Sequence, residues 1–104
     1  MLEQIKSLLG FGPKVDYKEL VRQGAIIVDV RTKGEYQNGS IKGSVNIPVQ
    51  NLQNNLGRLN KDKTIITCCA SGMRSGSAKR ILKSNGFKEV HNGGGWMSLE
   101  YKIK

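Results

Sequence analysis

The chain has 104 residues, the usual size of a single domain, and its 38% hydrophobic and 24% charged residues are typical of a folded globular protein. No apolar run approaches the roughly 20 residues that cross a membrane, so we expect no membrane partner. The formal net charge is +9, but the charges are scattered and few aromatic residues accompany them. This pattern argues against nucleic acid as a partner and fits a small anionic substrate or an acidic protein.

The cysteine and histidine content argues against both a disulfide framework and a metal site. The two cysteines, Cys68 and Cys69, are adjacent, and a disulfide between neighbours is strained. We therefore expect two thiols in a reducing compartment, the cytoplasm. The single histidine, His91, and the lack of a Cys-x-x-Cys pair argue against zinc. The sequence thus predicts no metal site, and nothing in it implies an organic cofactor.

Local signals in the first half of the chain predict an N-terminal segment, residues 1–14, ahead of a domain over residues 15–104. Two capping-box patterns, a continuous run of β-branched residues and a spaced set of leucines mark the elements. In chain order, these are a short amphipathic helix over Met1–Leu9, a helix from the Asp16 cap to about Arg22, a buried strand over Ala25–Val30, a helical turn starting at Thr32–Glu35, a short strand over Val45–Ile47, and a helix through Leu52, Leu56 and Leu59.

The second half continues the alternation of strands and helices. Its elements are a buried strand over Thr64–Cys69, a helix from Ser75 to about Ser84, a strand over Glu89–His91, a loop over Gly93–Gly95, and one or two helical turns over Trp96–Tyr101. Strands that alternate with helices indicate an α/β fold, in which a parallel sheet carries helices on both faces.

The segment after the second buried strand has the features of a reactive thiol. Cys69 ends that strand and a helix follows, so its sulfur is expected to face the unpaired N–H groups and the positive dipole at a helix start. Gly72 can adopt a positive φ, which lets the loop turn its N–H groups toward the sulfur. Together with the charge of Arg74, these features favour the thiolate. From the residues alone, a buried structural cysteine in a tight turn is the alternative.

Three ordered motifs resemble those of the rhodanese family of sulfurtransferases. The segment Cys69–Ser75, Cys-Ala-Ser-Gly-Met-Arg-Ser, is similar to that family's active-site loop, Cys-x-x-Gly-x-Arg-Ser. The segments Asp29–Tyr36 and Gly39–Pro48 resemble the family's first signature, and the glycines before Trp96 resemble its end. The resemblance covers nearly the whole chain.

The resemblance implies a rhodanese-like single domain, a central parallel sheet flanked by helices on both faces, in which Cys69 becomes persulfidated. It implies that the loop after Cys69 binds the substrate, through Ala70, Ser71, Gly72, Met73, Arg74 and Ser75. The expected donor is a small sulfur anion, thiosulfate or a persulfide, and the acceptor is a thiophilic molecule or a protein. Ala70 stands where relatives often carry arginine, so we expect thiosulfate to bind weakly.

Residues near the strand end are expected to support the site. Asp29 and Arg31 follow the first buried strand, and we expect them to brace the loop, with Arg31 paired to Glu35 across one turn. Cys68 should point to the opposite face from Cys69, as a small core residue or as a resolving thiol.

Near the C-terminus, Gly93–Gly95 should permit a close backbone approach to the loop, with Trp96 as a packing anchor.

Two other functions fit parts of the pattern. A non-catalytic or sulfur-carrier module would use the same fold to serve one protein partner. A cysteine-dependent phosphatase needs five residues between cysteine and arginine, whereas four separate Cys69 from Arg74. Counting from Cys68 gives five residues, but it leaves Ser71 where the phosphatase pattern requires glycine.

Overall fold

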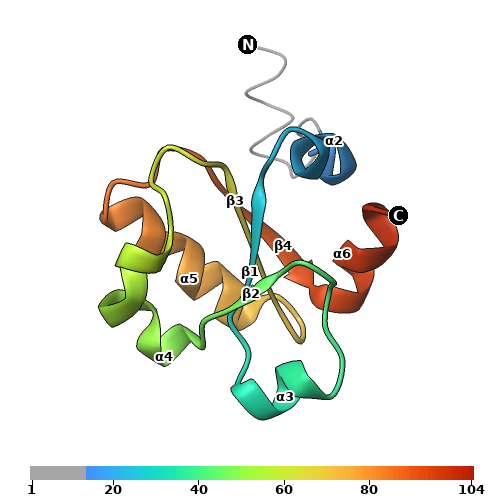
Figure 1. Ribbon diagram of the computed structural model, residues 1–104, viewed down its shortest axis with the longest axis horizontal. Coiled ribbons are helices and arrows are strands. Elements are labelled where there is room, and N and C mark those ends of the chain that lie inside the picture. The colour runs from blue at the N-terminus through green and yellow to red at the C-terminus, as the bar shows by residue number, and fades with distance from the viewer. Residues whose placement is uncertain (1–13) are drawn as a thin grey trace.

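The computed structural model describes residues 14–104, in which strands and helices alternate as the sequence predicts (Figure 1). The predicted helix over Met1–Leu9 lies outside the described residues. The elements, in chain order, are α2 (Tyr17–Arg22), β1 (Ile26–Asp29), α3 (Lys33–Gln37), β2 (Val45–Asn46), α4 (Val49–Leu52), the 3₁₀ helix η1 (Gln53–Arg58), β3 (Ile65–Cys69), α5 (Met73–Ser84), β4 (Val90–Gly95) and α6 (Trp96–Lys102).

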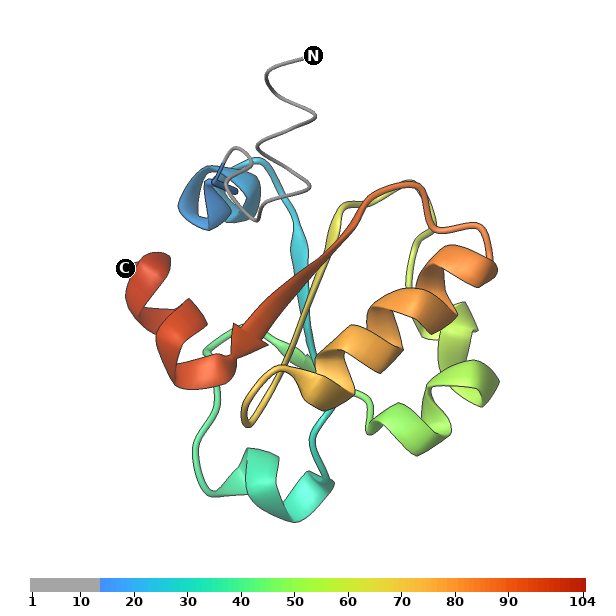
Figure 2. The ribbon, with the colours of Figure 1, turned by 180° about the vertical axis from the view of Figure 1, so that it is seen from behind.

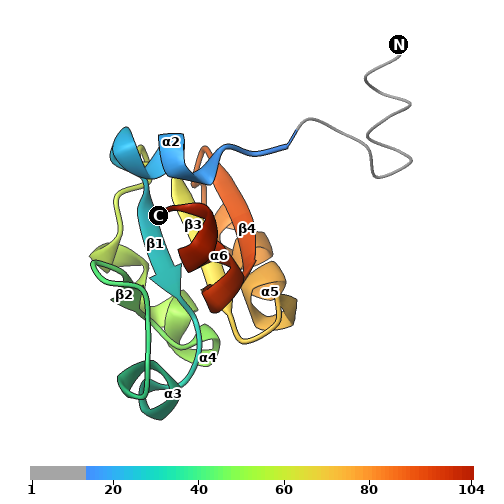
Figure 3. The ribbon, with the colours of Figure 1, turned by 90° about the vertical axis from the view of Figure 1, so that its right-hand side faces the viewer.

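The four strands form one parallel sheet in the order β2-β1-β3-β4. One hydrophobic cluster joins the sheet to α4, η1 and α5, and a second joins its other face to α2 and α6. Figure 3 shows α2 and α6 in front of the sheet and α4 and α5 behind it. The predicted α/β architecture, with helices on both faces, is confirmed.

Strand β3 lies between β1 and β4 and is buried along its whole length. Its side chains alternate between the two clusters: Ile65 and Cys69 face α5, while Ile66 and Cys68 face α6. The prediction that the two cysteines point to opposite faces is confirmed, and it follows from the two-residue period of a strand.

Both predicted capping patterns start helices. The Asp16 carboxylate accepts a hydrogen bond from the N–H of Glu19 at 3.0 Å and opens α2. Thr32 and Glu35 form a reciprocal capping box at the start of α3. These caps satisfy N–H groups that have no partner within the helix.

Two helices differ from the prediction. The expected helix through the three leucines is divided into α4 and η1 and ends before Leu59, and η1 is kinked at Asn55, which leaves helical geometry (φ −126°, ψ 18°). Its side chain donates to the carbonyl of Asn51 at 2.7 Å, in place of the backbone N–H that a continuous helix would use. Helix α5 begins at Met73, two residues earlier than predicted, because Gly72 at φ +106° turns the chain directly into the helix.

The prediction that Gly93–Gly95 form a loop is wrong, since they are the last three residues of β4. A Cβ atom on Gly93 would lie 2.9 Å from side-chain atoms of Ile66 and Leu99. Because Gly93 has no side chain, β4 packs closely against β3 and α6 at this position.

Candidate active site around Cys69

Cys69 is the last residue of β3, at the carboxyl edge of the sheet, where the chain turns into α5. Figure 2 shows this turn beside the end of β4 and the start of α6. The N–H of Gly72 donates to Cys69 Sγ at 3.0 Å, and Ser75 Oγ lies 3.4 Å from the same sulfur. Only 1% of Cys69 is exposed. A reacting group must therefore be small or narrow to reach the sulfur.

The surroundings of Cys69 favour its ionised form. Burial by itself raises the pKa of the Cys69 thiol, but hydrogen bonds to Ser75, Gly72 and Ser71 outweigh it, and the net pKa lies below the usual value. The sulfur also faces the start of the 12-residue helix α5, whose dipole favours a negative charge. The side chain is therefore prepared to act as a thiolate nucleophile.

Cys68 has the opposite environment. Its side chain is fully buried against α6, and burial, reinforced by the charge of Asp29, raises the pKa of its thiol to about 12. A thiol with that pKa stays neutral at physiological pH and is a poor nucleophile. The surroundings thus raise the pKa of Cys68 and lower the pKa of Cys69, although the two residues are adjacent.

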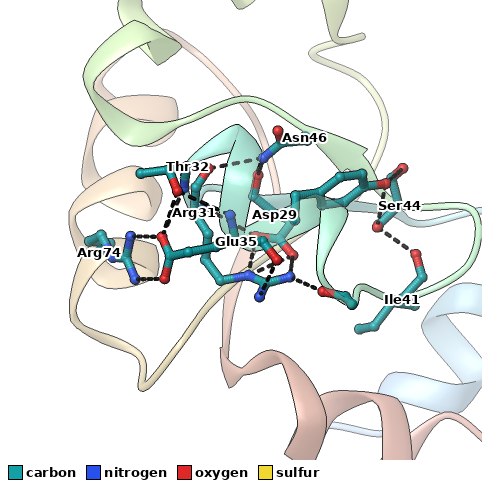
Figure 4. A network of polar contacts seen from close by, with 10 residues as sticks. Asp29, Arg31, Thr32, Glu35, Ile41, Ser44, Asn46 and Arg74 are labelled. Carbon is teal, nitrogen blue, oxygen red and sulfur yellow. Dashed lines mark hydrogen bonds and ion pairs between the residues drawn. The ribbon is translucent and has the colours of Figure 1, made fainter.

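Arg74 is held by Glu35 and does not contact the sulfur. Its two terminal nitrogens donate to the Glu35 carboxylate at 2.7 and 3.0 Å (Figure 4). The hydrogen bond from Arg74 and those from Thr32 lower the pKa of Glu35 to about 2, so the pair is ionised at all physiological pH values. The prediction that Glu35 pairs with Arg31 is wrong: Arg31 reaches only the Glu35 backbone carbonyl, at 3.4 Å.

We expect Arg74→Ala and Glu35→Gln to change the reactivity of Cys69 in opposite directions. Arg74→Ala removes a positive charge near the sulfur and should slow alkylation of Cys69 at neutral pH, while Glu35→Gln leaves that charge uncompensated and should speed it. Each effect should be about threefold, since the pair is partly exposed and screened. The measurement is the iodoacetamide rate against pH. Coincident curves for the two variants would remove the pair from the electrostatics of the site.

Asp29 and Arg31 form a second ion pair, deep in the fold. Three hydrogen bonds of 2.7 to 3.1 Å join the Arg31 guanidinium to the Asp29 carboxylate (Figure 4). Arg31 also donates to the carbonyl of Gly39 at 2.7 Å and lies 4.7 Å from the ring centre of Trp96. The pair ties β1 to the segment after α3 and to α6, and it lies on the face of the sheet away from Cys69.

Sequence reasoning missed Asn92, although it directly contacts the loop that follows Cys69. Its side chain accepts from Ser75 Oγ at 2.6 Å and donates to the carbonyl of Gly72 at 3.1 Å. The expected close approach of the glycines to the loop is present, because a Cβ on Gly95 would lie 2.9 Å from the carbonyl oxygen of Ala70. An asparagine just before three glycines suggests a turn, so the local sequence gives no sign that the Asn92 side chain contacts the loop.

The remaining loop residues lie at the surface. Ala70 and Ser71 are exposed, and Met73 is 83% exposed at the start of α5. Within residues 14–104, no three histidine, cysteine or acidic side chains gather as a metal site would require. No helix in the same part of the chain is long and apolar enough to span a membrane.

Comparisons with known proteins point to one family. The sequence model of the rhodanese-like domain matches residues 14–100. The putative sulfur carrier protein YrkF of Bacillus subtilis (strain 168) is 40% identical over 86 residues, which are 83% of this chain and 44% of that protein. The thiosulfate sulfurtransferase PspE of Escherichia coli (strain K12) is 36% identical over 70 residues, 65% of this chain and 67% of that protein.

A solved structure agrees with these sequence matches. The structure described as rhodanese with anions from E. coli has a TM-score of 0.68 and 31% identity, and it covers 72% of this chain and 91% of its own. The chain spans less than half the length of YrkF and about two thirds of that of PspE.

Proposed function

Because this chain belongs to the rhodanese-like domain family, we propose that it is a sulfurtransferase that carries a sulfane sulfur on Cys69. The observation that carries the proposal is the environment of Cys69 Sγ: it accepts a hydrogen bond from the Gly72 N–H at 3.0 Å, and its pKa is lowered. PspE supports the same reaction class, since it is named a thiosulfate sulfurtransferase. The two free thiols fit the reducing conditions of the cytoplasm.

The proposed reaction is a double displacement. The Cys69 thiolate attacks the outer sulfur of thiosulfate, the sulfur–sulfur bond of the donor breaks, and sulfite leaves with the bonding electrons. Cys69 then holds a persulfide, whose terminal sulfur carries the negative charge. An acceptor thiolate or cyanide attacks that terminal sulfur, and the Cys69 thiolate is released. The N–H groups of the loop stabilise negative charge in both steps.

The surroundings of the loop favour a persulfide or a protein over free thiosulfate as the donor. Ala70 offers no cation, and the charge of Arg74 is shared with Glu35. Met73 and Met97, in the first turns of the two helices that begin beside the loop, are 83% and 66% exposed. Exposed, flexible apolar side chains of this kind suit contact with another protein.

Steady-state transfer to cyanide, with thiosulfate and separately with glutathione persulfide as donor, tests the function and the donor together. We expect turnover with both, a thiosulfate KM in the millimolar range or above, and a lower KM for thiosulfate in Ala70→Arg. One charge-assisted hydrogen bond is worth about one to two decades in affinity. Micromolar saturation of the unchanged protein by thiosulfate would contradict the donor preference, and no turnover with either donor would contradict the enzyme.

A sulfur carrier for one partner is the second candidate, and the similarity to YrkF supports it. A carrier would accept sulfur on Cys69 but release it slowly to cyanide, so single loading without turnover would identify it. A phosphatase role has less support. The one arginine of the loop, Arg74, is bound to Glu35 and would first have to leave that partner to bind phosphate.

A further inference from the structure

The side chain of Asn92 is joined to the active-site loop at both ends of its amide. Its Nδ2 donates to the carbonyl of Gly72 at 3.1 Å, while its Oδ1 accepts from Ser75 Oγ at 2.6 Å and from the N–H of Gly94 at 2.9 Å. The orientation of the amide is set by these partners, because a backbone carbonyl only accepts and a backbone N–H only donates. Asn92 therefore holds the loop and the hydroxyl that faces Cys69 together.

The Ser75 hydroxyl has one proton, and two acceptors lie within its reach. Ser75 is fully buried, and its oxygen lies 2.6 Å from Asn92 Oδ1 and 3.4 Å from Cys69 Sγ. When Cys69 is a thiol, its S–H donates to Ser75 Oγ and the Ser75 proton goes to Asn92. When the thiol has lost its proton to solvent, the sulfur becomes an acceptor and competes for the Ser75 proton.

We propose that Asn92 is a positioning residue that sets the reactivity of Cys69 by competing with the sulfur for the Ser75 proton. The hydroxyl bound to Asn92 stabilises the thiol, and the hydroxyl turned to the sulfur stabilises the thiolate. The inference also rests on the proposed function in one respect: in the second displacement Cys69 Sγ regains its negative charge as the leaving group, and the same turn of Ser75 would stabilise it.

The charged groups around Cys69 are the same in both orientations of the hydroxyl. From α5 and α3 the sulfur faces the ion pair of Arg74 and Glu35, and from β3 it adjoins Cys68, which stays neutral. The pair of Asp29 and Arg31 belongs to the other face of the sheet. Substitutions at Ser75 and Asn92 leave all of these groups in place, so a change in Cys69 reactivity reports the hydrogen bonds.

A double-mutant cycle isolates the competition from any loosening of the loop. Four proteins are compared, all carrying Cys68→Ser so that iodoacetamide reports Cys69 alone: the parent, Ser75→Ala, Asn92→Ala and the double variant. The rate of alkylation is measured against pH. We expect Ser75→Ala to slow alkylation at neutral pH about tenfold, because the thiolate loses a donor. Asn92→Ala should speed alkylation when Ser75 is present. The factor by which it changes the rate should be at least about threefold larger with Ser75 than in the Ser75→Ala background.

The outcome separates a competing role from a purely structural one. An equal effect of Asn92→Ala in both backgrounds, or no slowing by Ser75→Ala, would overturn the inference. If Asn92→Ala does not fold, Asn92→Asp takes its place. It keeps an oxygen for Ser75 but adds a negative charge, which should slow alkylation in both backgrounds. We expect the slowing to be larger with Ser75 present than without it, and an equal slowing would overturn the inference.

These curves need no sulfur donor. The proposed function can therefore fail in the transfer assay while the coupling between Ser75 and Asn92 persists, and the reverse also holds.

Discussion

Replacing Cys69 with serine should abolish sulfur transfer, with a loss of turnover of about 10⁴-fold or more. Serine keeps the size of the side chain and can accept the Gly72 hydrogen bond, so the loop should fold unchanged. A hydroxyl is not ionised near neutral pH, and it cannot hold a sulfane sulfur as a cysteine does. The measurement is steady-state transfer from thiosulfate and from glutathione persulfide to cyanide.

The neighbouring residue supplies the matched control. Cys68→Ser changes the same side chain one position earlier, on the face of the sheet turned toward α6. We expect this variant to keep most of the activity, because a thiol whose pKa is about 12 takes no part as a nucleophile. Loss of transfer in Cys68→Ser with transfer retained in Cys69→Ser would mean that the reactive cysteine has been misassigned.

Arg31→Ala should produce the largest loss of stability, about 3–5 kcal/mol of the free energy of unfolding. Arg31 and Asp29 have side chains only 5% and 0% exposed, and their closest atoms are 2.7 Å apart. The substitution leaves the Asp29 carboxylate buried without its cation, and it also removes the donor to Gly39 and the cation beside Trp96. Urea unfolding followed by circular dichroism measures the change.

Two comparisons show that the loss comes from the unpaired charge. Arg22, whose side chain is 72% exposed, pairs with Glu19 on α2, and Arg22→Ala should leave the urea midpoint almost unchanged. Removing both buried charges together, with Asp29→Asn and Arg31→Leu, should cost less than Arg31→Ala alone. If Arg31→Ala shifted the midpoint no more than Arg22→Ala does, Arg31 would not brace the fold.

The sequence predicts features whose causes are local. The caps at Asp16 and Thr32 depend on residues three positions apart, and the strand over Ile65–Cys69 on a short run of β-branched and small residues. The opposite directions of Cys68 and Cys69 follow from the strand period alone. These signals place a thiol at the start of a helix, and the family resemblance adds the chemistry.

The features that were missed depend on contacts between distant segments. Arg74 binds Glu35 across 39 positions, and Ser75 binds Asn92 across 17. Only the pairing of strands brings such residues together, and no periodicity within one segment encodes it. Gly93 shows the same limit: three glycines indicate a loop locally, but the absence of a side chain is what lets β4 pack between Ile66 and Leu99.

The central claim, that Cys69 becomes a persulfide, is tested most directly by intact mass spectrometry under non-reducing conditions. The protein, Cys68→Ser and Cys69→Ser are each incubated with thiosulfate or glutathione persulfide and desalted. We expect the mass of one sulfur atom to be added to the first two proteins and none to Cys69→Ser. No added sulfur on the unchanged protein from either donor, or the same gain on Cys69→Ser, would contradict the claim.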